Sequence, residues 1–338
     1  MKTDVRIGYA LSSEEHRPAT LVANARRAEA AGFDFAMISD HFHPWIDKQG
    51  QSPFVWSILG GIAATTERIT VGTGVTALSV RIHPAILAQA AATVADMLPG
   101  RFWFGVGTGE NLNEHVLGDP WPEHSMRAAM LEEAVEVIRR LWTGELVDHD
   151  GEFYRVSRAR LYTLPDEPPP ILIAAGGDAT ATLAGKIGDG LITTAPESEL
   201  VSAFARGGRS AKGSKAGRPL VGQASVCWAK DEKSARRTAL EWWPTAAIPG
   251  DNGQELPLPS SFEAIAKLVT EDEVAEQISC GPDPEVHLAK IKPFIDAGFD
   301  HVYLHQIGPD QEGFFRFAEE ELLPRLGRSR SRSGRRAA

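Results

Sequence analysis

Residues 19–40 read ATLVANARRAEAAGFDFAMISD, and this stretch contains both halves of the unit that decides the fold. Apolar residues at helical spacing run from Ala19 to Ala31 and predict an amphipathic helix. Gly32 suits the position just after a helix end, where a positive φ is needed. The β-rich run Phe35–Asp40 then reads as a strand. The same Ala-Gly-Phe-Asp junction recurs at residues 297–300, before another strand candidate, so the chain repeats a helix-to-strand unit.

The alternation of strands and helices continues along the chain and predicts an α/β fold, a (β/α)₈ TIM barrel with insertion loops. The strand candidates are Val5–Leu11, Phe35–Asp40, Ile69–Val75, Phe102–Gly107, Ile171–Ala175, Gly190–Thr194, Gly222–Ala229 and His301–Gln306. The helix candidates are Ala19–Ala31, Val55–Thr66, Ala85–Met97, Ser125–Trp142, Ala179–Ile187, Ser234–Trp243, Val286–Ala297 and Gly313–Leu326. Eight such units favour a closed parallel barrel. A doubly wound sheet is favoured less, because no GxGxxG motif follows the first strand.

Three stretches interrupt this alternation, and each is expected to form an insertion after the fourth, sixth or seventh strand. Asp148–Pro170 contains a small hairpin with Asp150-Gly151 as its turn. Ala195–Arg218 and Pro244–Thr270 are rich in Gly, Ser and Pro and are predicted to be long loops, the second with a helical piece at Phe262–Val269. Insertions of this kind usually shape the active-site face of a barrel.

Composition limits the class of protein. The chain has 338 residues, 43% of them hydrophobic, which favours one barrel domain over residues 1–326 followed by a disordered basic tail over 327–338. The net charge is −10 although this tail contains five arginines, so nucleic acid is not an expected partner. No apolar run approaches the ~20 residues of a membrane helix. The N-terminus has no signal-peptide pattern, and the only cysteines are Cys227 and Cys280, so we expect a cytoplasmic protein.

Polar residues gather where the predicted strands end, which is where barrel enzymes place their chemistry. His41, next to Asp40, is a candidate general base, since histidine titrates near neutral pH and a neighbouring carboxylate tunes it. Alone, such a histidine is more often a loop residue with an ordinary hydrogen bond. The spacing of His41 and His43 also fits a metal site, but a matching set of ligands at other strand ends is not evident, and no metal is predicted.

Glycines follow the fourth and fifth strands. Gly105, Gly107 and Gly109 allow a flat ligand to approach the backbone closely, and Glu110 places a carboxylate beside them. Gly176-Gly177, before a predicted helix, fits either a phosphate-binding helix N-terminus or an ordinary turn. Together with His41, these strand ends supply a base, an acid and a close-approach surface.

The combination of three motifs resembles the luciferase-like barrel family, and most closely its F420-dependent glucose-6-phosphate dehydrogenase subgroup. The motifs are Ser39-Asp40-His41-Phe42-x-Pro44-Trp45, Gly107-Thr108-Gly109-Glu110-x-Leu112-Asn113-Glu114 and Ala174-Ala175-Gly176-Gly177, and the resemblance extends from about Val5 to Leu326.

The resemblance implies an F420-dependent dehydrogenase that moves a hydride from an alcohol or hemiacetal, possibly a sugar or sugar phosphate, to the deazaflavin. In that reading His41 removes the hydroxyl proton, Trp45 holds the substrate against the cofactor, and Glu110 protonates the cofactor ring or steadies its charge. Gly74-Val75 would form a non-proline cis peptide beside the ring. The cofactor would be lined by Asp40, Gly74, Val75, Ala77, Gly107, Thr108, Gly109, Asn113, Gly176 and Gly177.

The sequence departs from the subgroup at the substrate phosphate. Thr194 matches a threonine after the sixth strand that binds the substrate, but Glu197 stands where the subgroup has a lysine. Ala264 replaces the next lysine, with Lys267 and Lys290 as compensating candidates. The resemblance also implies a homodimer. Two alternatives remain open, an FMN-dependent luciferase-like monooxygenase and a ligand-binding barrel without catalysis.

Overall fold

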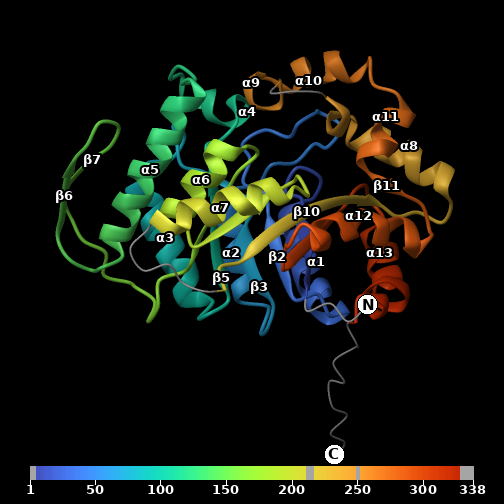
Figure 1. Cartoon of the computed structure of the whole chain (residues 1–338), viewed down its shortest axis with the longest axis horizontal. Coiled ribbons are helices and arrows are strands. Elements are labelled where there is room, and N and C mark those ends of the chain that lie inside the picture. Colours follow the sequence, from blue (N-terminus) through green and yellow to red (C-terminus); the bar gives the residue numbers. More distant parts are fainter. Residues whose placement is uncertain (1–4, 211–216, 249–251, 328–338) are drawn as a thin grey trace, which may run out of the picture.

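Eight parallel strands form a closed barrel in the computed structural model, which describes residues 5–210, 217–248 and 252–327 (Figure 1). The barrel strands are β1 (Arg6–Leu11), β2 (Phe35–Ile38), β3 (Thr70–Thr73), β5 (Phe102–Gly107), β8 (Ile171–Ala174), β9 (Gly190–Thr193), β10 (Leu220–Cys227) and β12 (His301–Gln306). All eight predicted strands are therefore confirmed, with ends that differ by a few residues.

The strands follow one another around the barrel in chain order, and β12 returns to pair with β1. The β9–β10 pairing closes the remaining gap, with Gly222 opposite Thr193. Two short strands extend the sheet at its carboxyl end. Strand β4 (Thr76–Ala77) pairs with β5, and β11 (Ser279–Cys280) pairs with the end of β10.

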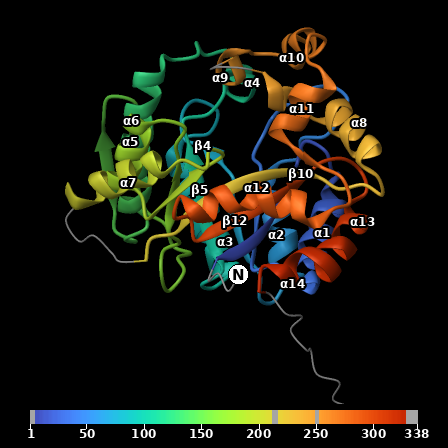
Figure 2. The same ribbon diagram turned by 45° about the vertical axis from the view of Figure 1, so that its right-hand side comes forward.

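Helices surround the barrel, and most of the main ones lie between successive strands (Figure 2). They are α1 (Pro18–Ala31), α2 (Val55–Ala63), α3 (Pro84–Met97), α5 (His124–Leu141), α6 (Asp178–Ile187), α7 (Ser198–Ser210), α8 (Glu232–Trp242), α12 (Pro284–Asp296) and α13 (Gln311–Phe317). The remaining helical segments are α4 (Asn111–Glu114), α9 (Asn252–Glu255), α10 (Pro259–Ala266), α11 (Glu271–Gln277), α14 (Leu323–Arg325), two 3₁₀ turns at His115–Leu117 and Pro244–Ala247, and a π-helical turn at Ala318–Leu322. In the described part of the chain, no helix is long and apolar enough to cross a membrane.

The repeated Ala-Gly-Phe-Asp junction has the same structure at both sites. Gly32 and Gly298 have φ values of 95° and 98°, which only glycine adopts without strain. The following aspartates each accept a hydrogen bond from a backbone N–H of an adjacent strand. Asp34 Oδ2 lies 2.8 Å from the nitrogen of Ile7, and Asp300 Oδ1 lies 2.8 Å from that of Leu220. The junction thus fixes how a strand enters the barrel.

The predicted loop over Ala195–Arg218 is wrong, because α7 occupies most of it. Its glycines permit close packing of helices rather than forming a loop. A Cβ added to Gly207 would lie 2.0 Å from the carbonyl oxygen of Thr182 on α6, and one added to Gly185 of α6 would lie 2.1 Å from that of Phe204. The segment after the sixth strand is therefore an ordinary βα unit and not an insertion.

The other two insertions are confirmed, with corrections in detail. β6 (Val147–Asp150) and β7 (Arg155–Ala159) form an antiparallel hairpin, and its connection spans residues 151–154 rather than a two-residue turn. The helical piece predicted at Phe262–Val269 begins earlier, as α10, and α11 follows it with a capping box between Thr270 and Glu273. From residue 328 on, the predicted disordered tail lies outside the described residues.

Candidate active site

A cavity of about 810 Å³ opens at the carboxyl ends of the barrel strands. Its wall contains residues that follow six strands, and residues from the segment between β10 and β12 lie over it. Of the predicted site residues, the wall includes Asp40, His41, Trp45, Gly74, Val75, Ala77, Gly107, Thr108, Gly109, Glu110, Asn113, Gly176 and Thr194. Gly177 and Glu197 are not part of the wall, and Glu197 is exposed.

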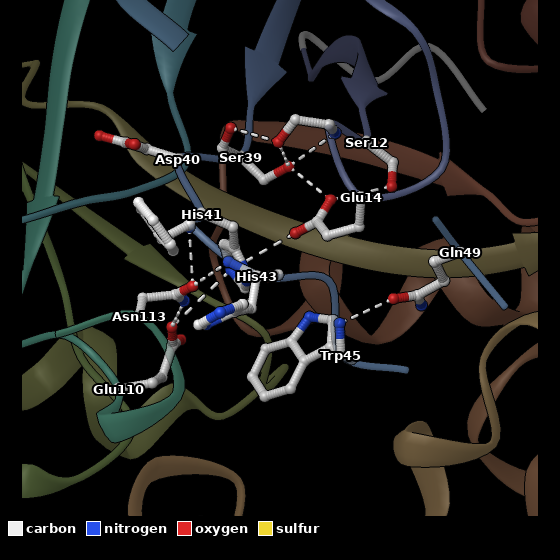
Figure 3. Close-up of polar contacts among 12 residues, drawn as sticks. Ser12, Glu14, Ser39, Asp40, His41, His43, Trp45, Gln49, Glu110 and Asn113 are labelled. Carbon is white, nitrogen blue, oxygen red and sulfur yellow. Dashed lines mark hydrogen bonds and ion pairs between the residues drawn. The ribbon is translucent and has the colours of Figure 1, made fainter. Parts of the chain in front are cut away.

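His41 lies between two carboxylates (Figure 3). Its Nε2 is 3.3 Å from Glu14 Oε1 and 3.7 Å from Glu110 Oε2. Its Nδ1 is 3.2 Å from the carbonyl oxygen of His43, which can only accept, so Nδ1 bears a hydrogen. Nε2 is therefore the nitrogen that gains or loses a proton, and it is the one that faces the two carboxylates.

Glu14 was not predicted as a site residue. It is 2% exposed in the loop after β1 and accepts hydrogen bonds from Ser39 Oγ (2.7 Å) and Ser12 Oγ (3.0 Å). Burial by itself raises the pKa of this carboxyl, but His41 and the Ser39 hydroxyl outweigh it and lower the pKa below 4.5. Its position in the sequence could have identified it, because it directly follows the first strand and so lies at the same end of the barrel as the other site residues.

Glu110 has the opposite shift. Desolvation raises the pKa of its carboxyl, whose side chain is 32% exposed, although His41 and Asn113 partly offset this, and the charge of Glu14 raises the pKa further. Asn113 holds this corner together. Its Nδ2 donates to Glu110 at 3.1 Å, and its Oδ1 accepts from the backbone nitrogens of Phe42 and His43 at 2.8 and 3.1 Å.

Asp40 does not act on His41, contrary to the interpretation of the sequence. Its carboxylate points away from the imidazole (Figure 3) and lies 2.9 Å from Arg81 and 2.8 Å from Thr76 Oγ1. Arg81 also lies 3.3 Å from Glu114, and the side chains of all three charged residues are at most 8% exposed. This buried Asp40–Arg81–Glu114 network links the loops after β2, β3 and β5.

The loops after β3 and β5 also form a wall of the cavity along which a ligand can approach the backbone closely. The Gly74–Val75 peptide is cis, as expected. Gly109 has a φ of 81°, and a Cβ there would lie 2.9 Å from that of Ala77. A Cβ on Gly107 would lie 2.9 Å from Val75 Cγ2. Glycine is therefore required at both positions, whereas Gly176 has open space around it.

Aromatic side chains bound the other side of the cavity. The Trp45 ring lies 5.2 Å from the His41 ring and 5.2 Å from that of Phe262 on α10. Its backbone nitrogen donates to Gln49, whose amide donates to the carbonyl of Trp242. The His41–Trp45 loop is thus attached to the segment that covers the cavity.

The chain as a whole is similar to a known protein family. The luciferase-like monooxygenase family model matches residues 2–301. The chain belongs to this family. The F420-dependent glucose-6-phosphate dehydrogenase of Nakamurella multipartita is 39% identical over 334 residues, which cover 95% of this chain and 96% of that protein. The enzyme of the same name from Nocardia farcinica is 38% identical, with coverages of 96% and 98%.

Within the luciferase-like family, a solved structure is also similar over its full length. It is an F420-dependent secondary alcohol dehydrogenase in complex with an F420–acetone adduct, with a TM-score of 0.88, 31% identity, and coverages of 96% of this chain and 99% of that one. The family and the barrel fold predicted from the sequence are confirmed. Over the described ranges, no group of three or more His, Cys, Asp or Glu side chains is arranged to hold a metal ion.

Proposed function

We propose that this chain is an F420-dependent dehydrogenase that oxidises the CH–OH group of an alcohol or hemiacetal. The observation that supports this most is the position of His41 Nε2 between Glu14 and Glu110, in a cavity whose wall also contains Gly74, Gly107 and Gly109. The similar full-length relatives and the solved dehydrogenase are named as F420-dependent enzymes, which favours this cofactor over FMN.

The residues present fit a flat ring system. Gly107 and Gly109 leave no room for a side chain, and the cis Gly74–Val75 peptide lies beside them, so this wall offers backbone and small side chains only. Ala77, Thr108 and Gly176 continue this wall, and Gly177 stands just outside it at the start of α6. Asp40 and Asn113 also line the cavity, where hydrogen bonds to other protein groups hold them in place.

The side chains have separable roles. Bound F420 supplies a hydride acceptor. His41 accepts the hydroxyl proton at Nε2, as a general base whose hydrogen at Nδ1 is fixed by the His43 carbonyl. Glu14, with its lowered pKa, is the carboxylate that orients the imidazole, while Glu110, with its raised pKa, keeps a proton to higher pH than an ordinary carboxyl. Trp45 packs on His41 and limits where the substrate carbon can lie.

The charge of the cavity favours a neutral substrate. The carboxylate of Glu14 lines it, and Lys290 is the only lysine or arginine in the wall that the described residues form. Thr194 lies at the end of β9 beside the cavity, whereas Glu197 is exposed and outside the wall. A phosphate group binds best to several cationic side chains. An unphosphorylated sugar or a secondary alcohol therefore fits better than a sugar phosphate.

The cofactor assignment is tested by titrating the purified protein with F420 and with FMN. The expected result is saturable F420 binding and loss of the oxidised-deazaflavin absorbance when an alcohol is added. FMN binding with oxygen consumption would favour the monooxygenase, and binding of either cofactor without turnover of any alcohol would favour a non-catalytic barrel.

We also propose a homodimer in a reducing cytoplasm. Phe54, Ile86 and Met126 lie at the beginnings of α2, α3 and α5, are each about half exposed, and would be covered by a second copy. Both cysteines are buried free thiols, which is consistent with that compartment. Light scattering after size-exclusion chromatography should give twice the chain mass of 36.6 kDa, and a monomer at micromolar concentration would contradict the dimer.

A further inference from the structure

A second carboxylate–imidazole pair lies at the same cavity, with the imidazole in the wall and the carboxylate buried behind it, and has no role in the chemistry described so far. Glu15 Oε2 is 3.1 Å from His305 Nε2. Glu15 is next to Glu14 after β1, and His305 is near the carboxyl end of β12. Since β1 and β12 are neighbours in the barrel, the pair is adjacent to the Glu14–His41 pair.

The Glu15 carboxylate is held rigidly. Its side chain is fully buried, and Oε1 accepts a hydrogen bond from the backbone nitrogen of Gly308 at 2.9 Å. An anion in this position fixes the proton of His305 on Nε2. The ring of Trp243 packs edge-on against the imidazole at 4.4 Å and restricts its rotation. The orientation of His305 is thus set from two sides.

The other nitrogen of His305 is available to a ligand. His305 lines the cavity, and its Nδ1 has no hydrogen-bond partner among the residues that the structure describes. Trp243 and Thr245, which lie over the cavity, line the same region. A buried imidazole with one nitrogen satisfied and one facing a cavity is expected to bond to whatever polar group enters.

The surrounding charges indicate which group that is. Glu14 and Glu15 both lie close to His305, and the lowered pKa of Glu14 is partly due to His305. Two neighbouring carboxylates disfavour an anionic ligand. A hydroxyl group is neutral and both donates and accepts, so it matches either charge state of the imidazole.

We propose that His305, oriented by Glu15, is a substrate-binding residue that hydrogen-bonds a second hydroxyl group, so that the enzyme prefers vicinal diols and sugars to simple alcohols. This inference rests on the proposed dehydrogenase function. His41 and His305 then contact different oxygens of one substrate, the first at the reacting C–OH and the second beside it.

The test compares cyclohexane-1,2-diol with cyclohexanol, and 2,3-butanediol with 2-butanol, using F420 as acceptor. The wild-type protein should have a kcat/KM at least about tenfold higher for each diol, the size expected for one hydrogen bond that a site is built to make. His305→Phe retains a ring against Trp243 and should remove most of this preference, mainly through KM, while changing cyclohexanol oxidation by less than about threefold. Glu15→Gln should have a smaller effect in the same direction, and the double variant should lose little more than His305→Phe alone.

His16→Phe is the matched control, because His16 is a buried imidazole beside Glu15 that does not line the cavity. It should leave the diol preference unchanged. Equal losses on diols and simple alcohols in His305→Phe, or wild-type turnover without diol preference, would overturn the inference while leaving the dehydrogenase function intact. Failure of the wild-type protein to bind F420 or to oxidise any alcohol would instead overturn the proposed function, and this inference with it.

Discussion

Two ion pairs in this protein have the same N–O distance, but one is buried and the other is exposed. Comparing them tests whether the buried pair stabilises the active-site loops. Arg81 lies 2.9 Å from Asp40, and the two side chains are 8% and 0% exposed. Arg155 lies 2.9 Å from Asp150 in the β6–β7 hairpin, and these side chains are 85% and 84% exposed. We expect Arg81→Met to destabilise the protein strongly and Arg155→Met to have almost no effect.

The magnitude follows from what each substitution leaves behind. Without Arg81, the carboxylates of Asp40 and Glu114 stay buried with no cation, and breaking a buried ion pair in this way costs about 3–5 kcal/mol. Surface pairs in general contribute less than about 1 kcal/mol, because water solvates the remaining charge. The difference in the free energy of unfolding between the two variants should therefore be several kcal/mol.

Equilibrium urea denaturation followed by tryptophan fluorescence measures both values, and F420 titration measures the consequence for the site. Arg81→Met should also weaken F420 binding, because the network joins the loops around the glycine wall. Adding Asp40→Asn to Arg81→Met should recover part of the loss by removing one unpaired charge. Equal destabilisation by Arg81→Met and Arg155→Met, or no recovery in the double variant, would refute this reasoning.

Three other outcomes test the site itself. His41→Ala should reduce turnover about 10²–10⁴-fold with F420 affinity nearly unchanged, and Glu110→Gln should also impair turnover. Stopped-flow absorbance measures the turnover of both variants, and F420 titration measures their affinity for the cofactor. Loss of F420 binding by His41→Ala, with normal turnover of the enzyme that does bind it, would mean that His41 is structural. Because the folded-state pKa of Glu14 lies below 4.5, its carboxylate stabilises the fold above that pH and loses this effect as the pH falls. The unfolding free-energy advantage of the wild type over Glu14→Gln should thus be constant near neutrality and shrink in acid, and an advantage that grows in acid would contradict the sign. Glucose 6-phosphate should be a poor substrate compared with glucose in steady-state kinetics, because Lys290 is the only lysine or arginine in the described cavity wall. Efficient saturable turnover of the phosphate would restore the sugar-phosphate assignment.

Local signals in the sequence were sufficient for most of the barrel. Period-two and period-3.6 patterns located all eight strands and the helices between most of them, because each element buries one face against its neighbours. The junctions at Gly32 and Gly298 were recognisable since a positive φ after a helix requires glycine. Helix α7 was missed because its glycines were interpreted as loop residues. Glycine is usually a sign of a turn, but Gly207 is needed for contact with α6, which the sequence of α7 alone does not reveal.

The candidate site was predictable as a set of strand ends but not as a set of contacts. His41, Trp45 and Glu110 line one cavity as expected. The partner of His41 was not predictable, because Asp40 is adjacent in sequence but turned toward Arg81, while Glu14 comes from another strand. Which carboxylate reaches an imidazole depends on the direction of side chains across the barrel, and this is a tertiary property. Arg81 went unnoticed because it follows the short strand β4 as a single cation with no motif around it.

The contrast between Glu14 and Glu110 shows how one site separates the tasks of two identical functional groups. Both carboxylates are within 4 Å of the same imidazole nitrogen, so proximity to His41 does not distinguish them. Their other contacts do. Two serine hydroxyls donate to Glu14 and stabilise its anion, whereas one amide of Asn113 donates to Glu110, which also feels the negative charge of Glu14. The pKa values move apart, and environments that separate two carboxyls in this way are typical of acid and base assignments. Nε2 of His41 thus lies between a fixed anion and a carboxyl that retains its proton to higher pH. A proton that reaches this nitrogen from a substrate hydroxyl is stabilised by Glu14, and Glu110, 3.7 Å away, can accept it only after giving up its own proton.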